Sequence, residues 1–350
     1  MNNIREIIDA ELREQVIHGA VVLCGTPSHE LFRMETGYNS PEHNAPMRLD
    51  TVIDIASITK VCACVTGLLV AHSRGLIDFE APFTQYLPQY QPQLKNMVRV
   101  RDLANHTSGF HEVPEPATAQ RRYFSESGHE MLQNVFRLPP PFAPSRQAHY
   151  ACWNYILLAQ ILEQVTGCPF PEFCRKEIFE PLGMSASSIG APCPGIPADR
   201  IARTERAATP GAISDSVAFR FYRDGLSTGN AGMFSTAEDL AKLMKCHLNH
   251  GEYATGKYLF SKDTFAEIAP DRGFHSEGYR RFGWTIWADG MREEDFGSVL
   301  LHHGYTGQTL LMHLPKRLFC IVLTTRFKDY ARAKKDRMMI ISRLLQKFAS

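Results

Sequence analysis

The sequence predicts an α/β (α+β) protein in which a mostly antiparallel sheet is flanked by N- and C-terminal helices, with a mainly helical domain inserted in the middle. Three observations predict this class. Strand-like runs occur near both ends of the chain, an amphipathic helical pattern lies outside the strands at each end, and the middle combines helical periodicity with many Pro and Gly residues. We therefore expect a sheet domain of residues 1–75 and 216–350 and an inserted domain of residues 76–215.

The N-terminal segment has apolar residues at helical spacing over residues 4–17, and Gly19 follows as a helix terminator. Two strand-like runs come next, at residues 20–24 and 31–36, and turn residues close each of them. Residues 57–72 (SITKVCACVTGLLVAH) are small and apolar on nearly every side. That pattern is typical of a helix buried inside a protein rather than lying on its surface.

The remaining elements follow the same two periodicities. Residues 155–165 are the best helical segment of the middle region, and Gly167 ends it. A capping box formed by Ser235 and Glu238 predicts the start of another helix, and residues 331–348 form an amphipathic helix that closes the chain. Between these two helices lie four strand-like runs, at residues 282–288, 299–302, 309–314 and 318–324.

Charge and hydropathy exclude several functional classes. The chain has 38 Lys and Arg against 37 Asp and Glu, a net charge of +1, and no long block of like charge. This composition does not predict binding to nucleic acid or to an anionic membrane surface. No apolar run approaches the length of a membrane span, and the first 20 residues lack the layout of a secretory signal. A cytoplasmic location is expected, with a trimmed secreted form as the alternative.

Cysteine usage and pattern also limit the choice of cofactors and partners. The 9 cysteines are scattered and include no C-x-x-C pair, which predicts reduced, buried thiols rather than disulfides or a zinc site. No metal and no cofactor are expected. The expected partner is a small molecule or a short peptide or ester. The chain has no sustained heptad pattern, and the sequence therefore specifies no oligomeric state.

Three familiar signatures are near misses. Residues 251–257 fit G-x-x-x-x-G-K, but Tyr258 stands where a phosphate loop needs Ser or Thr. Three His-Glu pairs lack the second His of a zinc protease motif. Residues 225–229 (GLSTG) match G-x-S-x-G, the nucleophile elbow of α/β-hydrolases. The charged stretch before Ser227 and the absence of a βαβα alternation favour a glycine-rich loop instead.

Ser57 and Lys60 form the only S-x-x-K in the sequence. Residues three apart on a helix share a face, so the Ser57 hydroxyl and the Lys60 amine are expected to meet. The apolar surroundings disfavour the ammonium form of the lysine, and a neutral amine can act as a base toward the hydroxyl. The alternative interpretation is a simple helix start with Ser57 as the N-cap.

Two further residues complement this pair. Tyr150 opens the segment that leads into the helix at residues 155–165, and His302 ends a strand-like run in the sequence His302-His303-Gly304. Together with Ser57 and Lys60 they supply what acyl transfer needs. These requirements are a nucleophile, candidate proton carriers, and a strand edge whose N–H groups could face an oxyanion.

These residues resemble landmarks of the serine β-lactamase and penicillin-binding protein superfamily. The resemblance is to its class C branch, together with D-aminopeptidases, D-Ala-D-Ala carboxypeptidases and esterases, and it covers nearly the whole chain. The landmarks stand in family order: residues 50–60 as the approach to S-x-x-K, residues 100–109 (VRDLANHTSG) as the "RDLLTHTSG" stretch, Tyr150 of the Y-x-N motif, residues 231–240 as "GGLFSTAxDL", and residues 302–304 as an H-x-G variant of K-T-G.

The resemblance implies a β-lactamase/transpeptidase-like fold with the active site between the two domains. It implies that Ser57 is acylated by an ester, amide or β-lactam carbonyl, and that Lys60 and Tyr150 carry the proton. The backbone N–H groups of Ser57 and Tyr305 would form the oxyanion hole, and His302 would replace the K-T-G lysine. The residues expected near the substrate are Cys152, Asn154, His303 and Gly304.

The chain departs from the family at one functional position. Cys152 stands where the Y-x-N motif has its asparagine, and a thiol is a weak hydrogen-bonding group compared with a carboxamide. Asn154 would substitute for it only in a rearranged loop, and no base is evident for Cys152 itself. We therefore expect a serine hydrolase that is esterase-like or weakly β-lactamase-like. The alternatives are a D-amino-acid peptidase or carboxypeptidase, and a catalytically silent penicillin-binding-like protein.

Overall fold

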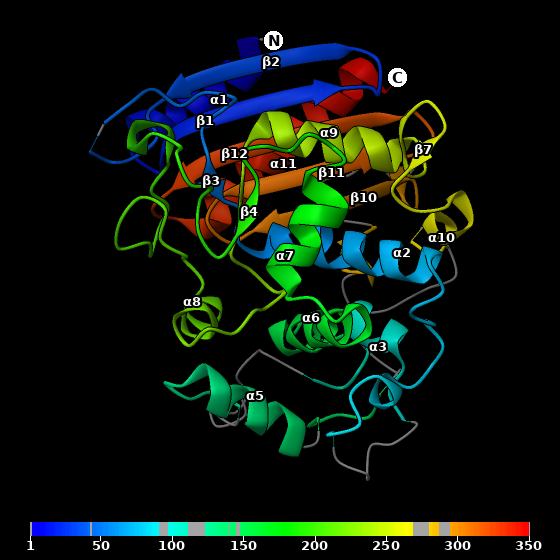
Figure 1. The fold of residues 1–350 in the computed structure, drawn as a ribbon. Coiled ribbons are helices and arrows are strands. Elements are labelled where there is room, and N and C mark those ends of the chain that lie inside the picture. Colours follow the sequence, from blue (N-terminus) through cyan, green and yellow to red (C-terminus); the bar gives the residue numbers. More distant parts are fainter. Residues whose placement is uncertain are drawn as a thin grey trace.

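The computed structural model describes residues 2–42, 44–90, 97–110, 123–138, 140–144, 148–268, 280–286 and 295–349. Its centre is a seven-stranded antiparallel sheet in the order β2-β1-β12-β11-β10-β9-β8 (Figure 1). The predicted fold class is therefore confirmed. The strands are β1 (Ile17–Gly25), β2 (Glu30–Gly37), β8 (Arg280–Arg281), β9 (Trp284–Thr285), β10 (Val299–Gly304), β11 (Gln308–His313) and β12 (Leu318–Arg326).

The central strands are buried on both faces, which explains why their sequences are continuously apolar. In β1, Val21 and Leu23 belong to one hydrophobic core, while Val22 and Cys24 belong to the core on the opposite face. Successive side chains of a strand point to opposite faces, so an unbroken apolar run serves two cores at once. The sheet therefore lies between two layers of helices.

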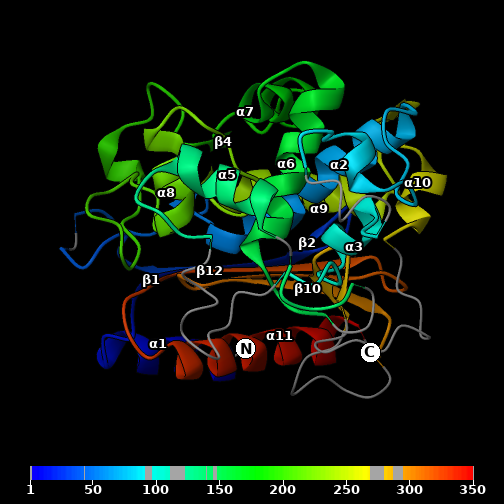
Figure 2. The same cartoon turned by 90° about the horizontal axis from the view of Figure 1, so that it is seen from below.

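The terminal helices α1 (Asn2–Arg13) and α11 (Tyr330–Phe348) cover one face of the sheet (Figure 2). The prediction of a helix over residues 4–17 is wrong at its C-terminal end. Gln15 has a positive φ of 55°, which turns the chain, and Ile17 is already the first residue of β1. Val16 continues the apolar spacing of the helix and packs in the same core, but it lies beyond the end of the helix.

The other helices lie on the opposite face of the sheet (Figure 2). Those with described bounds are α2 (Thr66–Ser73), α3 (Val100–Ala104), α5 (Gly128–Arg137), α6 (Cys152–Thr166), α7 (Phe170–Cys174), α8 (Ser216–Arg223), α9 (Ala237–Leu248) and α10 (Lys262–Ala266). Two smaller sheets accompany them. They consist of β3 (Ile53–Asp54), β5 (Met233–Ser235) and β4 (Ser188–Ile189), and of the pair β6 (Glu252–Ala254) and β7 (Lys257–Tyr258).

Two boundaries differ from the prediction. The expected domain boundary at residue 215 divides a three-stranded sheet, because β4 precedes it and pairs with β5, which follows it. Helix α9 is capped by Thr236, whose side chain accepts a hydrogen bond from Asp239 N at 3.1 Å, rather than by Ser235, which belongs to β5.

Residues 251–257 lie in and beside the β6–β7 pair, and this excludes a phosphate loop there.

The predicted buried helix at residues 57–72 consists of three successive helical segments. A 3₁₀ turn, η1 (Ala56–Ile58), leads into a π-helical stretch, η2 (Lys60–Val65), and then into α2. Single π turns inside helices often mark functional positions. Ala56–Ser73 is the one segment in the described part of the chain that is long and apolar enough to cross a membrane, so the expectation that no apolar run approaches this length is wrong. Of this segment, 83% is buried inside the protein. A core helix of a soluble domain has the same properties.

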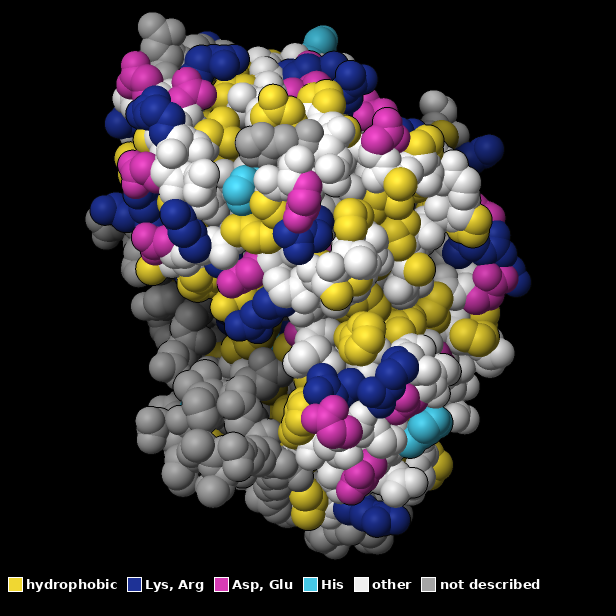
Figure 3. Space-filling view, turned by 90° about the vertical axis from the view of Figure 1, so that its left-hand side faces the viewer, with side chains coloured by type: hydrophobic (Ala, Val, Ile, Leu, Met, Phe, Trp, Pro, Cys, Tyr) yellow, Lys and Arg dark blue, Asp and Glu magenta, His cyan; other side chains and the backbone are white. Residues whose placement is uncertain are grey.

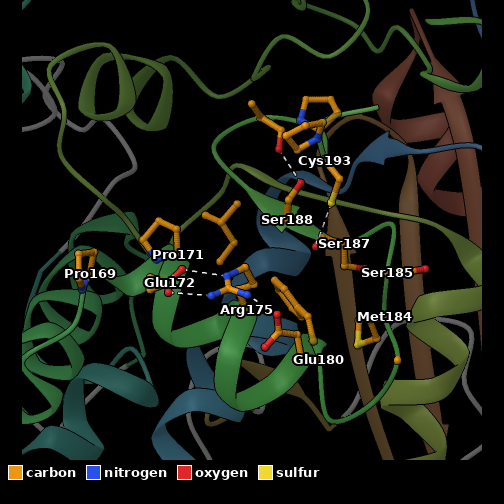
Figure 4. Close-up of a pocket in the computed structure, with 16 residues that line it drawn as sticks. Pro169, Pro171, Glu172, Arg175, Glu180, Met184, Ser185, Ser187, Ser188 and Cys193 are labelled. Carbon is orange, nitrogen blue, oxygen red and sulfur yellow. Dashed lines mark hydrogen bonds and ion pairs between the residues drawn. The ribbon is translucent and has the colours of Figure 1, made fainter. Parts of the chain in front are cut away.

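The surface adds two observations. On the face shown in Figure 3, acidic and basic side chains are interspersed and form no large patch of one sign. A cavity of about 790 Å³ lies beside α7 and β4, lined mainly by apolar residues such as Pro171, Phe179 and Ile189 (Figure 4). None of the residues that line it belongs to the predicted catalytic set.

Candidate active site

Ser57 lies on a strained turn between β3 and the buried helix. Ala56, immediately before it, has a left-handed backbone with a φ of 48°, a conformation that non-glycine residues seldom adopt. Asp54 Oδ1 accepts a hydrogen bond from Ala56 N at 2.8 Å, and Asp54 Oδ2 accepts bonds from Ser214 N at 2.8 Å and Ser214 Oγ at 2.7 Å. Strain of this kind persists only where the surroundings hold it, and it is common at functional sites.

Lys60 is fully buried and is the first residue of η2. Its Nζ lies 3.2 Å from Ser57 Oγ, 3.3 Å from Cys152 Sγ and 2.9 Å from the carbonyl oxygen of Asn230. The contact expected from the S-x-x-K spacing is therefore present. The amine is held by partners from three separate segments, the helix itself, the start of α6 and the loop before β5.

Tyr150 lies beside Lys60 and is held by rings and cations around it. Lys60 Nζ is 4.8 Å from the centre of the Tyr150 ring, and the guanidinium of Arg280 is 4.9 Å from it. The ring of His106 stacks on Tyr150 with 4.7 Å between centroids. The structure thus brings together the nucleophile and both proton carriers predicted from the sequence.

His106 is a fixed, neutral support for this arrangement. Its Nδ1 accepts hydrogen bonds from Ala151 N and from the amide nitrogen of Asn154, both at 3.1 Å, so its proton is on Nε2. Burial, followed by the charges of Arg280 and Lys60, holds the pKa of His106 well below its usual value. The imidazole therefore stays uncharged near neutral pH and adds no further positive charge beside Lys60.

Cys152 and Asn154 take different roles in the structure. Cys152, the first residue of α6, faces Lys60 and is 8% exposed. Asn154 is fully buried. Its carbonyl accepts a hydrogen bond from Ser108 Oγ at 2.5 Å, and its amide nitrogen donates to His106. The predicted contact between Asn154 and a substrate is therefore wrong, because both ends of the carboxamide are used inside the protein.

The end of β10 lies directly against the nucleophile turn. A Cβ atom on Gly304 would come within 2.8 Å of the carbonyl oxygen of Ile55, so only glycine allows this approach. Tyr305 follows at the start of the turn to β11. The first N–H groups of a helix have no partner within the helix, and the N–H of Ser57 stands at such a position. Both predicted oxyanion donors are therefore on neighbouring segments.

His302 and His303 face opposite sides of β10, as the alternation of a strand requires. His302 lies near Lys60 and Arg280, whose charges act on its ring. His303 Nδ1 is 2.9 Å from Thr309 Oγ1, and the charges that act on its ring are, in decreasing order, those of Arg337 and Lys334 in α11 and that of Arg280. The prediction that His303 binds substrate is wrong because its side chain lies behind the sheet.

His302 is a neutral hydrogen-bond acceptor and not a cation. Its Nδ1 donates to the carbonyl oxygen of His303 at 2.9 Å, which leaves Nε2 unprotonated, buried and without a hydrogen-bond partner among the described residues. Burial, then the charges of Arg280 and Lys60, holds the pKa of His302 well below its usual value. A neutral imidazole does not attract a substrate carboxylate as the expected replacement for a lysine would.

Arg280 supplies the charge that His302 lacks. It lies on β8, at the edge of the sheet, and its guanidinium packs on Tyr150. Burial lowers the pKa of Arg280, and the ionisable hydroxyl groups of Tyr150 and Tyr155 are among the groups that partly offset this effect. No acidic side chain of the described chain forms an ion pair with Arg280. A guanidinium forms charge-assisted, often bidentate hydrogen bonds with carboxylate and phosphate groups.

Several of these residues carry no recognisable catalytic motif in the sequence. Arg280 belongs to a short edge strand in a region with a weak pattern, and Asp54 is one acidic residue among many. Asn230 follows the G-x-S-x-G segment, which forms a loop after α8 and not a strand-to-helix elbow. The interpretation of this segment as a loop is confirmed, and the loop places the Asn230 carbonyl on Lys60.

Within the described residues, no group of three or more metal-ligating side chains lies together.

The fold and the cluster of Ser57, Lys60 and Tyr150 define a serine hydrolase of the class that the sequence motifs indicate. The chain belongs to the Beta-lactamase family, whose model matches residues 4–344. It is thus a β-lactamase-related serine hydrolase.

Individual relatives show how varied this family is. A protein of Escherichia coli (strain K12), provisionally named a D-alanyl-D-alanine carboxypeptidase, is 26% identical over an alignment of 306 residues that covers 79% of this chain and 69% of the relative. The fold is similar to that of a class C β-lactamase from Rhodobacter sphaeroides, with a TM-score of 0.73, 21% identity and coverage of 99% and 100%. It is also similar to the D-amino acid amidase from Ochrobactrum anthropi SV3, with a TM-score of 0.73, 22% identity and coverage of 99% and 98%.

Proposed function

We propose that the protein hydrolyses small esters through an acyl-enzyme on Ser57. The observation that carries this proposal is the buried Lys60 amine, 3.2 Å from Ser57 Oγ. Ser57 Oγ attacks the carbonyl carbon while its proton passes to the neutral amine of Lys60. Tyr150, beside that amine, passes a proton to the leaving group. The N–H groups of Ser57 and Tyr305 stabilise the oxyanion, and the reverse proton path activates the water that releases the acyl group.

Cys152 is the reason for favouring esters over amides and lactams. Its thiol contacts Lys60, but it is a weak donor and acceptor for a substrate amide. An amide also has a poorer leaving group than an ester and depends more on hydrogen bonds that align it. The alternative carboxamide, Asn154, is fully engaged by Ser108 and His106. An ester substrate does not need the missing contact.

The proposal predicts that Cys152→Asn gains turnover of amides and lactams. An asparagine at this position restores a carboxamide beside Lys60, and we expect kcat/KM for nitrocefin and D-alanyl p-nitroanilide to rise about tenfold, equivalent to one hydrogen bond of about 1.4 kcal/mol. Hydrolysis of p-nitrophenyl acetate should change less than threefold. Initial rates on the three substrates measure both effects.

Cys168→Asn is the matched control, because this thiol lies near the end of α6, away from Lys60, and is partly exposed. An equal gain in the control, or no gain of lactam and amide turnover in folded Cys152→Asn, contradicts the role assigned to Cys152. Absence of ester hydrolysis in the wild type, together with turnover of D-alanyl anilide, would favour the peptidase alternative.

Arg280 favours a second candidate, a hydrolase that acts beside a carboxylate, as a carboxypeptidase does. The guanidinium lies against Tyr150, close to where the leaving group departs, and no described acidic residue neutralises it. A charge-assisted hydrogen bond to a substrate carboxylate contributes about 1.5–3 kcal/mol. Esters and peptides with a free carboxylate on the leaving group are therefore the preferred substrates within the proposed class.

We expect Arg280→Met to lower kcat/KM about 10- to 100-fold for 3-acetoxybenzoate, an ester whose leaving group carries a carboxylate. For the uncharged phenyl acetate kcat/KM should fall less than threefold, because only the first ester uses the guanidinium. Steady-state rates with both esters measure this preference. Arg281→Met is the control on the neighbouring residue of β8, whose Nε donates to the carbonyl oxygen of Glu267. An equal loss on both esters would show that Arg280 acts on the fold and not on substrate choice.

A further inference from the structure

The turn that carries the predicted oxyanion donor Tyr305 is clamped by one buried arginine. Arg326, at the end of β12, is 1% exposed. Its Nε and Nη2 donate to the carbonyl oxygen of Tyr305 at 3.0 and 2.7 Å, and its backbone N–H donates to Thr306 O at 3.2 Å. The same guanidinium lies 4.8 Å from the centre of the Tyr305 ring. One side chain thus holds both the backbone and the ring of Tyr305.

Arg326 is itself held in place from the other side. Its Nη2 forms an ion pair with Glu205, which belongs to the loop that follows η6 (Ala198–Arg200). Tyr330, at the start of α11, stacks on Tyr305 with 5.1 Å between centroids, and the Arg326 guanidinium is 5.4 Å from the Tyr330 ring. The guanidinium is therefore fixed by partners from three segments, which are the turn after β10, the loop after η6 and the start of α11.

The peptide unit that contains the Tyr305 N–H is held by hydrogen bonds, and so is the unit that follows it. Its own carbonyl oxygen, Gly304 O, accepts a hydrogen bond from Gly307 N at 3.2 Å. The carbonyl oxygen of the next unit, Tyr305 O, is bound by Arg326. These hydrogen bonds restrict the direction of the Tyr305 N–H. An oxyanion hole depends on such preorganisation, because donors that must reorient during the reaction lose most of their effect.

We propose that Arg326, oriented by Glu205, is a positioning residue for oxyanion stabilisation. It keeps the Tyr305 N–H aimed at the reacting carbonyl and binds the Tyr305 carbonyl oxygen, whose negative dipole would otherwise repel the oxyanion. This inference rests on the proposed function, since it assigns Tyr305 N–H to the acyl-transfer site. A purely structural role would instead lower the melting temperature and leave kcat and the affinity for a tetrahedral adduct unchanged.

The experiment compares Arg326→Lys and Glu205→Gln with Glu42→Gln. Lysine keeps the positive charge but lacks the fork that binds the carbonyl. Glu42 is the matched control, because it forms an ion pair with Arg203 in the same loop and neither residue contacts Tyr305 in the described structure. The readouts are kcat and KM for p-nitrophenyl acetate, the inhibition constant of phenylboronic acid, whose Ser57 adduct is tetrahedral, and the melting temperature.

For Arg326→Lys we expect kcat to fall about 100-fold, the phenylboronic acid inhibition constant to rise by a similar factor, and KM to stay within threefold. Glu205→Gln should show the same pattern at about a tenth of that size, and Glu42→Gln should stay within twofold of the wild type. Glu205→Gln decides the matter if Arg326→Lys does not fold. A folded variant that loses thermal stability while kcat and boronate affinity stay within twofold overturns the proposal.

A separate measurement distinguishes this failure from failure of the proposed function. Wild-type protein is incubated with a fluorophosphonate, and the mass of the intact chain is measured. If the wild type forms no adduct on Ser57, the proposed function fails and Arg326 has no acyl-transfer site to support. If the adduct forms in every variant while the kinetic pattern above is absent, the assignment of Arg326 alone is wrong.

Discussion

Replacing Lys60 with methionine lowers the rate of Ser57 acylation about 1,000-fold, the range expected for loss of a general base. Among the described residues, the Lys60 amine is the basic group that contacts Ser57 Oγ, at 3.2 Å. Methionine fills a similar volume in the buried site without a base, so the helical segment should remain folded. The burst of p-nitrophenol from p-nitrophenyl acetate, followed by stopped flow, measures acylation directly.

Lys60→Arg separates basicity from charge. Arginine is permanently protonated and therefore accepts no proton from Ser57. We expect it to acylate as slowly as Lys60→Met, and circular dichroism checks that both variants fold. Acylation within tenfold of the wild type in either folded variant would show that another group removes the proton, and the role assigned to Lys60 would be wrong.

Replacing Glu11 with glutamine stabilises the folded protein at alkaline pH by about 5 kcal/mol. Glu11 is fully buried in α1, where burial and then the charge of Asp336 raise its pKa to about 8, although Arg337 and Arg332 partly offset this. Above the ordinary value of 4.5 the unfolded chain releases the proton while the folded chain still holds it. Stability therefore falls by about 1.4 kcal/mol per pH unit from about pH 4.5 to about pH 8.

Glutamine has no proton to lose, so the difference between variant and wild type should vanish near pH 4.5 and be largest above pH 8. Urea unfolding at pH 4.5, 6.5 and 8.5 measures it. Glu14→Gln is the control. This carboxylate is exposed and paired with Arg332, which lowers its pKa, so its loss should give a small destabilisation at neutral pH. A pH-independent difference for Glu11→Gln would contradict the buried, raised pKa.

The strands and the catalytic pair were predictable because each rests on a local pattern. The unbroken apolar runs of β1 and β12 mark strands buried on both faces, and the spacing of Ser57 and Lys60 places both side chains on one helical face. The end of the first helix was not predictable in the same way. Val16 and Ile17 continue its spacing and are buried in the same core, but they reach that core from a strand.

The sequence misplaced His303 and Asn154 and did not indicate Arg280, because the neighbours of these side chains come from segments that are distant in the sequence. The pleat of β10 sends His302 toward Lys60 and His303 toward α11, and one residue of register decides between them. Asn154 is drawn to Ser108 and His106 through contacts 46 and 48 residues apart in sequence. Arg280 reaches Tyr150 from the edge of the sheet, and no motif accompanies it.

The measurement that tests the central claim most directly is the site of covalent labelling by a fluorophosphonate. Intact-mass analysis and peptide mapping should find one phosphonyl group per chain, on Ser57. The label should be absent from Ser57→Ala and unchanged in Ser227→Ala, whose serine lies in the G-x-S-x-G loop. A label that persists in folded Ser57→Ala, or that is lost in Ser227→Ala, would show that Ser57 is not the nucleophile.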